Sequence, residues 1–243
     1  MIKNIYFRYK RRTKKALFLL SYFLLRHRRA IAKLSSYGFA DIRIYRLKLW
    51  KANCKYYQAD MDGEKCFIKV STDCIAAKNE IFINKYLAGC GFSFVPMLLL
   101  SDESYDSGEF LLVTEFKSNM RVFSLPEDEK AFELICAEFE NIHGLFRQFD
   151  IIHGDLFPGN LRLDADNHIC IIDFGVGWVP GSGEYPEEYL YRGVNTGSAV
   201  VYDNARAFLN MLEDCGISNA FKQKECYKRI ERLVGAHTYT VEL

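Results

Sequence analysis

The spacing of apolar and polar positions changes at about residue 41. Beyond it, short alternating runs predict strands, and longer runs with apolar positions three and four apart predict helices. The expected strands are 42–50, 54–59, 65–70, 96–100 and 110–116, and the expected helices are 73–87 and 127–147. Asp62 and Gly63 supply a turn between the second and third strands, and Pro126 precedes the long helix. Three strands, a helix, two strands and a long helix predict an α+β fold.

The last third of the chain has a less regular pattern. Two short apolar runs, 151–152 and 169–172, enclose a polar loop. The sequence is then irregular to about Val201, and apolar spacing predicts helices up to Leu212 and over 220–234. Repeats and low-complexity segments are absent from the sequence. A chain of 243 residues, 49% of them hydrophobic, is long enough to bury a sizeable core.

The positive charges are concentrated before the change in pattern. Residues 1–40 contain eleven Lys and Arg and no Asp or Glu, although the whole chain has a net charge of only +1. An apolar stretch, Ala16–Leu25, lies between the basic clusters. It is too short to span a bilayer, and Arg26, Arg28 and Arg29 follow where a secretory signal would have small residues. We therefore expect no export and a cytoplasmic location.

Two interpretations of this basic arm remain open. The arm is either an interfacial helix on an anionic membrane surface or a helix that packs on the body of the protein. In the first case the protein would be peripheral at the inner face of the membrane. The apolar side chains that would enter the membrane are Leu17, Phe18, Leu20, Phe23 and Leu24. Their apolar and aromatic character favours a membrane over nucleic acid.

The eight cysteines do not form a recognisable framework. They contain no C-x-x-C pair, and their spacing is unlike that of small secreted domains. We expect reduced thiols that mainly act as small buried hydrophobic residues. Zinc binding is not predicted.

The polar loop carries the strongest chemical signal. Residues 151–175 read IIHGDLFPGNLRLDADNHICIIDFG, so Asn160 follows Asp155 by five residues and Asp173 follows Asn160 by thirteen. Single Asp and Asn residues are common in turns, but this spacing resembles the catalytic and metal loops of the protein-kinase-like superfamily. HGDLFPGN corresponds to H-R-D-x-x-x-x-N, and IIDFG corresponds to D-F-G. Gly154 in place of arginine resembles the aminoglycoside, choline and bacterial saccharide kinases and the small atypical Ser/Thr kinases.

The resemblance implies an ATP- and Mg²⁺-dependent phosphotransferase. Asp155 would be the catalytic base that accepts the proton of a substrate hydroxyl, and Asn160 and Asp173 would bind Mg²⁺ through oxygen. His153 would support the loop by hydrogen bonds and would not act as a base. Phe174 and Gly175 would pack and turn the metal loop.

Upstream residues also match the family pattern. Lys69 lies in an apolar strand, FIKV, where the resemblance implies the ATP-phosphate lysine, and Glu80 on the following helix would be its ion-pair partner. Their separation is shorter than in typical protein kinases, and Glu80 could instead belong to a solvated helix face. The strand LLVTEF implies a hinge at which the main chain of Glu115 to Lys117 would bind adenine.

Three departures from the family pattern affect this interpretation. The turn WKANCKY between the first two strands has no glycine, so Asn53 would have to supply a tight turn, or the loop would contact nucleotide poorly, as in a pseudokinase. The segment 175–193 lacks an A-P-E motif, and the chain ends 68 residues after Gly175, which implies a trimmed C-terminal lobe. Asp203 resembles the aspartate that anchors the catalytic loop, although a helix N-cap is an equally simple role.

The resulting prediction is a two-lobed, protein-kinase-like α+β fold. It has a basic arm (1–40), an N-terminal lobe (41–117) and a mainly helical C-terminal lobe (118–243). The favoured function is transfer of the γ-phosphate of ATP to a hydroxyl of a saccharide, lipid-linked sugar or other small molecule. A small Ser/Thr protein kinase and a nucleotide-binding pseudokinase are the alternatives. The sequence does not identify the acceptor.

Overall fold

The computed structural model describes residues 2–50, 53–106, 108–182 and 193–243, with the side chains of 2–12 and Lys48 excepted. Helices and antiparallel strands are both present, so the predicted α+β class is confirmed. The chain divides into two compact units. The first comprises Met1–Cys74 and Leu99–Phe116, and the second comprises Ile75–Leu98 and Lys117–Leu243. Residues 1–40 therefore belong to the first unit.

The first unit contains a five-stranded sheet in the order β1-β2-β3-β5-β4. The strands are β1 (Ala40–Ile44), β2 (Cys54–Met61), β3 (Glu64–Ser71), β4 (Leu98–Asp106) and β5 (Glu109–Glu115). Alternation along β3 separates its two faces: Cys66, Ile68 and Val70 are buried in one core, whereas Phe67 and Lys69 point to the opposite face. Lys69 is opposite Tyr56 of β2 and Leu112 of β5 in the ladder.

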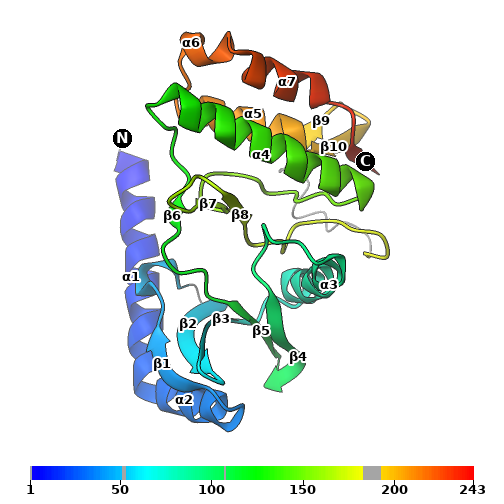
Figure 1. Ribbon diagram of the computed structural model, residues 1–243. Coiled ribbons are helices and arrows are strands. Elements are labelled where there is room, and N and C mark those ends of the chain that lie inside the picture. The colour runs from blue at the N-terminus through cyan, green and yellow to red at the C-terminus, as the bar shows by residue number, and fades with distance from the viewer. Residues whose placement is uncertain (1, 51–52, 107, 183–192) are drawn as a thin grey trace. The chain divides into compact units, whose positions relative to one another are not determined.

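Two helices, α1 (Ile2–Leu25) and α2 (His27–Ser36), pack beside this sheet (Figure 1). Tyr22 and Leu34 are buried in the same core as Ile68 and Val70. Of the two interpretations left open for the arm, packing on the protein body is thus confirmed for these two residues. It also corrects the membrane interpretation for Phe18 and Phe23, since both side chains pack against this core.

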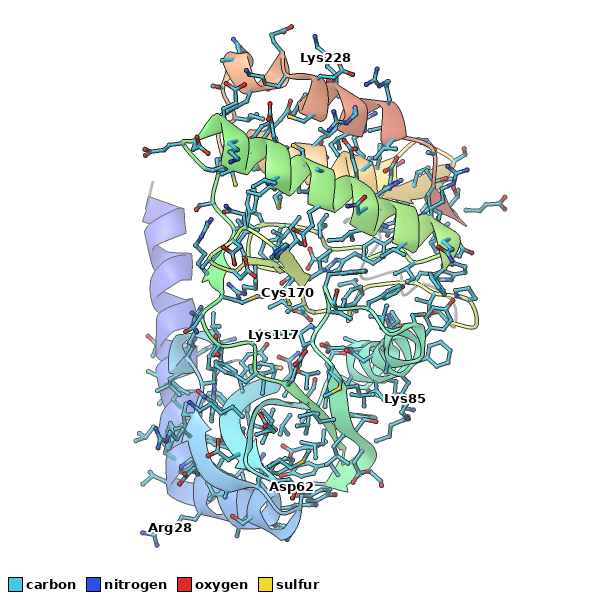
Figure 2. The ribbon with its side chains drawn as sticks, in the orientation of Figure 1. Arg28, Asp62, Lys85, Lys117, Cys170 and Lys228 are labelled. Atoms are coloured by element: carbon cyan, nitrogen blue, oxygen red, sulfur yellow. The ribbon has the colours of Figure 1, made fainter. Side chains whose placement is uncertain are left out.

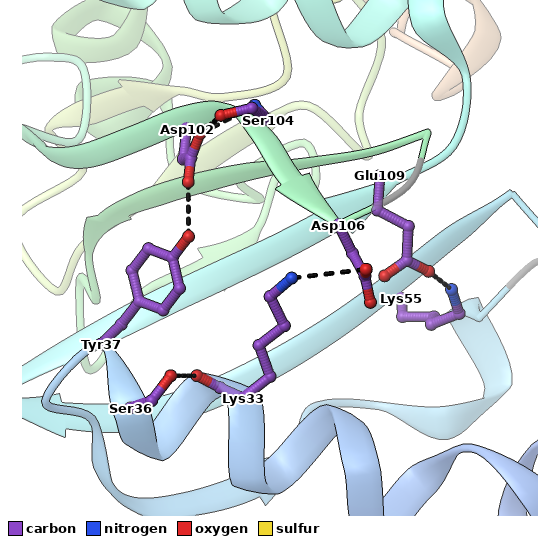
Figure 3. A network of polar contacts seen from close by, with 8 residues as sticks. All are labelled: Lys33, Ser36, Tyr37, Lys55, Asp102, Ser104, Asp106 and Glu109. Carbon is purple, nitrogen blue, oxygen red and sulfur yellow. Dashed lines mark hydrogen bonds and ion pairs between the residues drawn. The ribbon is translucent and has the colours of Figure 1, made fainter.

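Polar contacts fix α2 and its C-terminal end to the sheet (Figure 3). Lys33 of α2 forms an ion pair with Asp106 at 3.4 Å, and the Tyr37 hydroxyl donates a hydrogen bond to Asp102. Nearby, the buried Lys55 ammonium contacts Glu109 at 2.7 Å. The first two contacts join the first forty residues to β4, and the third joins β2 to β5.

The connection between β1 and β2 differs from the expected strand over 42–50. The strand β1 ends at Ile44, and a short 3-10 helix, Leu47–Leu49, leads to Trp50. The Trp50 indole is fully buried, stacks on Phe23 and donates hydrogen bonds to the carbonyls of Tyr45 and Tyr56. Burial of this large ring ends the alternating pattern and anchors the connection to α1.

The second unit contains helices and two small sheets. The helices are α3 (Cys74–Cys90), which starts one residue before the unit, α4 (Glu129–Gln148), α5 (Asn204–Asp214), α6 (Asn219–Lys222) and α7 (Glu225–Leu233). One sheet has β6 (Arg121–Val122), β7 (Leu161–Leu163) and β8 (Ile169–Ile171), and the other has β9 (Val194–Asn195), β10 (Ala199–Asp203) and β11 (Thr238–Glu242). Aromatic packing joins α4 and α5, because the Phe139 and Phe208 rings are stacked with their centroids 3.8 Å apart.

Two features of the sequence have simple structural outcomes. All eight cysteines are free thiols and five of them are buried, which confirms the prediction for these residues. Within the described residues, none of the helices is long and apolar enough to cross a membrane.

Candidate functional site

The catalytic-loop motif folds as a compact turn within the second unit. The Asn160 amide Nδ2 donates a hydrogen bond to the Asp155 carbonyl at 3.0 Å, and the Asn160 main-chain N–H donates to Phe157 at 2.9 Å. This hydrogen bond fixes the orientation of the Asn160 side-chain amide. Asn160 is 5% exposed and Asp155 is half-buried.

A hairpin brings the metal-loop motif to this turn. Leu161 of β7 pairs with Ile171 of β8, so the residue before β7 and the residues after β8 lie at the same end. The pairing continues there, because the Ile172 N–H donates to the Asn160 carbonyl at 2.9 Å. The structure therefore brings the neighbourhoods of Asp155, Asn160 and Asp173 together, although eighteen positions separate the first from the last.

Asp173 has an unusual backbone conformation. Its φ of +67° lies in the left-handed region, where Asp and Asn are tolerated better than most residues other than glycine. Its side chain is exposed, and Glu80 of α3 is buried nearby. A methyl group at Gly175 would lie 3.6 Å from Asp173 Oδ1 and 3.7 Å from Glu80 Oε2, so both carboxylates border Gly175.

His153 connects the two loops through both nitrogens of its ring. Nε2 lies 3.1 Å from the Ile172 carbonyl, and Nδ1 accepts a hydrogen bond from the Asp155 N–H at 3.2 Å. A carbonyl only accepts, so Nε2 carries the proton and the ring is neutral. Burial lowers the pKa of His153 to about 4, in agreement with this tautomer. The supporting role expected for His153 is thus present.

The buried neutral histidine predicts a loss of stability in acid. Unfolded His153 would titrate near its ordinary pKa of 6.5, whereas the folded side chain titrates at about 4. The unfolded state therefore binds more protons below 6.5, and the free energy of unfolding falls as the pH is lowered. The expected loss through His153 between pH 7.5 and 5 is about 2 kcal/mol.

Urea unfolding followed by Trp178 fluorescence, in a Trp50→Phe background, measures this loss. The variant His153→Gln removes the titrating group and should lose about 2 kcal/mol less than its parent over the same pH range. His143, whose pKa burial also lowers, remains in both chains and cancels in the comparison. Equal pH dependence in both chains would contradict the neutral, buried assignment.

Asn204, at the start of α5, anchors the catalytic loop and was not predicted. Its side-chain oxygen accepts a hydrogen bond from the His153 N–H at 3.0 Å, and its Nδ2 donates to the Ile151 carbonyl at 2.8 Å. Asn204 is 1% exposed. Of the two roles considered for Asp203, the helix N-cap is confirmed: Asp203 caps α5 and accepts a hydrogen bond from the Arg206 N–H at 3.0 Å and another from the Gly235 N–H. The anchoring contacts to the loop come from Asn204 instead.

A second asparagine that the sequence analysis missed supports the metal loop. Asn79 of α3 donates hydrogen bonds from Nδ2 to the carbonyls of Gly175 at 3.2 Å and Gly177 at 2.9 Å. Asn79 precedes Glu80 in the sequence, so one turn of α3 contacts the loop that follows Asp173. The only available signal was the run of three adjacent polar residues, Lys78 to Glu80, in a largely apolar helix.

Gly154, which replaces the family arginine, has a positive φ of +74°. An L-residue is strained in this conformation, whereas glycine adopts it freely. The departure from H-R-D is therefore matched by a backbone geometry that favours glycine.

The remaining predicted residues are divided between the two units. Lys69 is on β3, the third strand as predicted, and Glu80 is on the next helix, but in the second unit. Burial of Glu80 excludes a solvated helix face. Glu115 ends β5, and the chain passes from the first unit to the second between Phe116 and Lys117, within the expected hinge.

The glycine-free turn is partly described. The Asn53 carbonyl accepts hydrogen bonds from the Thr72 N–H at 2.9 Å and the Ser71 hydroxyl at 3.2 Å, whereas Lys51 and Ala52 lie outside the described residues. Within the described chain, no three His, Cys, Asp or Glu side chains gather as a metal site. Asn160 and Asp173, for which Mg²⁺ binding was predicted, lie at the same end of the β7–β8 hairpin.

A shallow hollow adjoins the catalytic loop in the second unit. Its walls include Gly154, Tyr202, Arg206 and Asn210. Gly154 directly precedes Asp155, so the hollow lies beside the expected catalytic base. Its guanidinium, amide and phenol groups could form hydrogen bonds with a polar acceptor.

Comparison with known proteins gives a partial similarity. No protein-family model matches the chain. The chain is 30% identical to the serine/threonine-protein kinase sck1 of Schizosaccharomyces pombe in an alignment of 112 residues that covers 42% of this chain. The matched region is 14% of that kinase, so the chain spans a small part of its length. Part of the chain is thus similar to a protein kinase.

Proposed function

We propose that this chain is an ATP- and Mg²⁺-dependent phosphotransferase with a two-lobed, protein-kinase-like fold. The observation that carries the proposal is the hydrogen-bonded connection among Asp155, Asn160, His153 and Ile172. It holds a candidate base and two candidate oxygen ligands in adjacent loops. The partial similarity to a protein kinase supports the same reaction class.

Each residue would have a specific role. Asp155 would accept the proton of the acceptor hydroxyl. At the same time the oxygen of that hydroxyl attacks the γ-phosphorus, and the bond from the γ-phosphorus to the leaving ADP breaks. Asn160 and Asp173 would hold Mg²⁺, which neutralises phosphate charge when bound. Lys69 would bind the α- and β-phosphates with Glu80 as its ion-pair partner, and the main chain from Glu115 to Lys117 would bind adenine.

The proposed acceptor is a small hydroxyl compound such as a saccharide or a lipid-linked sugar. Two observations support it: glycine at position 154 with its positive φ, and the hollow with Arg206 and Asn210 beside the catalytic loop. A second candidate, a small Ser/Thr protein kinase, is favoured by the similarity to such a kinase. The glycine-free turn around Asn53 is the observation that favours a nucleotide-binding pseudokinase.

Replacing Asp155 with asparagine tests the proposal. The variant keeps the size of the side chain but cannot accept a proton, so acceptor-dependent ATP consumption should fall at least about 100-fold. Mg-ATP binding, measured by calorimetry, should be retained. Asp166→Asn, on the exposed turn between β7 and β8, is the matched control and should keep full activity. Undiminished turnover in Asp155→Asn would contradict the assignment.

A further inference from the structure

The outer face of α1 is apolar although its inner face already packs on the sheet. Phe18, Tyr22 and Phe23 contact the core of the first unit. On the opposite side, Leu17, Leu20 and Leu24 are 61%, 59% and 74% exposed. These three leucines are spaced by three and four residues and therefore form one stripe along the helix. Packing of α1 on its own sheet does not account for them.

Basic side chains surround this leucine stripe. Lys14 is exposed on α1, and Arg26, Arg28 and Arg29 are exposed where α1 meets α2. Arg28 projects away from the ribbon at this junction (Figure 2). The first forty residues contain no carboxylate, and the carboxylates that hold this segment, Asp102 and Asp106, lie on β4. The exposed side of the helix is thus both apolar and cationic.

We propose that the leucine stripe docks the first unit on an anionic lipid surface, with α1 lying in the plane of the interface. Exposed leucines would enter the boundary between head groups and acyl chains, and the flanking Lys and Arg would contact anionic head groups. The excess of positive charge is the observation that selects this partner, because a protein partner or a second copy of the helix would need no such charge. Phe18, Tyr22 and Phe23 do not take part, because they are committed to the core.

The geometry of the arm makes this surface rigid. The Tyr22 ring lies 5.4 Å from the Trp50 ring, between centroids, and its hydroxyl forms a hydrogen bond with the Tyr57 hydroxyl. The Lys55 ammonium lies 5.3 Å from the Tyr22 ring centroid. A helix fixed in this way presents its leucines without first having to fold on the membrane, so less conformational entropy is lost on binding. Docking would place the first unit, which contains Lys69, at the lipid surface.

Vesicle co-sedimentation of the full chain tests the proposal. With vesicles of phosphatidylcholine and phosphatidylglycerol, the chain should sediment, and binding should fall at least about tenfold with added salt or with phosphatidylcholine alone. The triple variant Leu17→Gln/Leu20→Gln/Leu24→Gln should bind at least about tenfold more weakly. Glutamine is a good helix former and the leucines are exposed, so the circular dichroism and melting temperature of the triple variant should equal those of the parent chain.

A matched control uses exposed leucines elsewhere in the same unit. Leu47→Gln/Leu49→Gln, in the β1–β2 connection, should bind vesicles as the parent chain does. Equal binding of the triple variant and the parent would overturn the proposal, as would failure of the folded parent to bind anionic vesicles. Sedimentation velocity tests for a dimer, and retention on RNA tests for RNA binding. If the parent does not bind vesicles but forms a dimer or an RNA complex that the triple variant does not form, the leucine stripe has that partner and the lipid proposal is wrong.

Discussion

Replacing Asp173 with asparagine is expected to lower Mg²⁺-dependent ATP consumption by about 100-fold or more without unfolding the protein. The physical reason is loss of the anionic oxygen that would bind Mg²⁺, which leaves phosphate charge less well neutralised. Asn tolerates the left-handed φ of +67° at this position, so the backbone need not change. The measurement is the rate of ADP formation over a range of Mg²⁺ concentrations.

A series of substitutions at position 173 separates metal binding from backbone strain. Asp173→Asn and Asp173→Gly both fit the left-handed backbone, whereas Asp173→Ala should be less stable than the glycine variant by about 1 kcal/mol. All three should be comparably inactive. If activity instead followed stability across the series, the backbone and not the carboxylate would be the important property, and the metal assignment would be wrong.

Among substitutions outside the loop 151–160, replacing Asn204 with alanine is expected to destabilise that loop most. The change removes two hydrogen bonds and leaves the buried Ile151 carbonyl and His153 N–H without their partner. Each such loss costs about 1–3 kcal/mol, so the second unit should lose roughly 2–5 kcal/mol. Because His153 also contacts Asp155, turnover should fall as well.

Hydrogen exchange distinguishes local loosening from general destabilisation. Amides in the loop 151–160 should exchange faster in Asn204→Ala, whereas those of β2 and β3 in the first unit should be unchanged. Asn141→Ala, an exposed position within α4, is the control and should leave both exchange and activity as in the parent chain. Unchanged exchange in the loop of Asn204→Ala would contradict the anchoring role.

Much of the first unit could be predicted because its signals are local. Alternation around Lys69 and the Asp62-Gly63 turn indicated the β2–β3 hairpin with errors of no more than two residues at the strand ends. The end of β1 was mispredicted, because burial of Trp50 under Phe23 is a contact between distant residues. Strands β9, β10 and β11 were missed because they are short, and because the partners β10 and β11 are separated in the sequence by α5, α6 and α7.

The candidate site could be predicted in its residues but not in its support. The spacing of Asp155, Asn160 and Asp173 is visible in the sequence because each belongs to a short motif. Asn79 and Asn204 hold the same loops from distant helices, and an asparagine on a helix carries no local signal of its hydrogen-bond partners. Similarly, the apolar stretch between basic clusters indicated a helix that either lies on a membrane or packs on the body, but only the structure separates Phe18 and Phe23 from the exposed leucines.

Acceptor-dependent ATP consumption by the parent chain is the most direct test of the proposed phosphotransferase. Purified protein with Mg²⁺ would be presented with saccharides, lipid-linked sugars and generic protein acceptors, with Asp155→Asn and metal-free samples as controls. We expect at least one hydroxyl acceptor to accelerate ADP formation, and mass spectrometry should show that this acceptor has gained one phosphoryl group. Neither the accelerated ADP formation nor the phosphorylated acceptor should be found in the two controls. Tight Mg-ATP binding without turnover on any acceptor would contradict the proposed phosphotransferase and identify a pseudokinase instead.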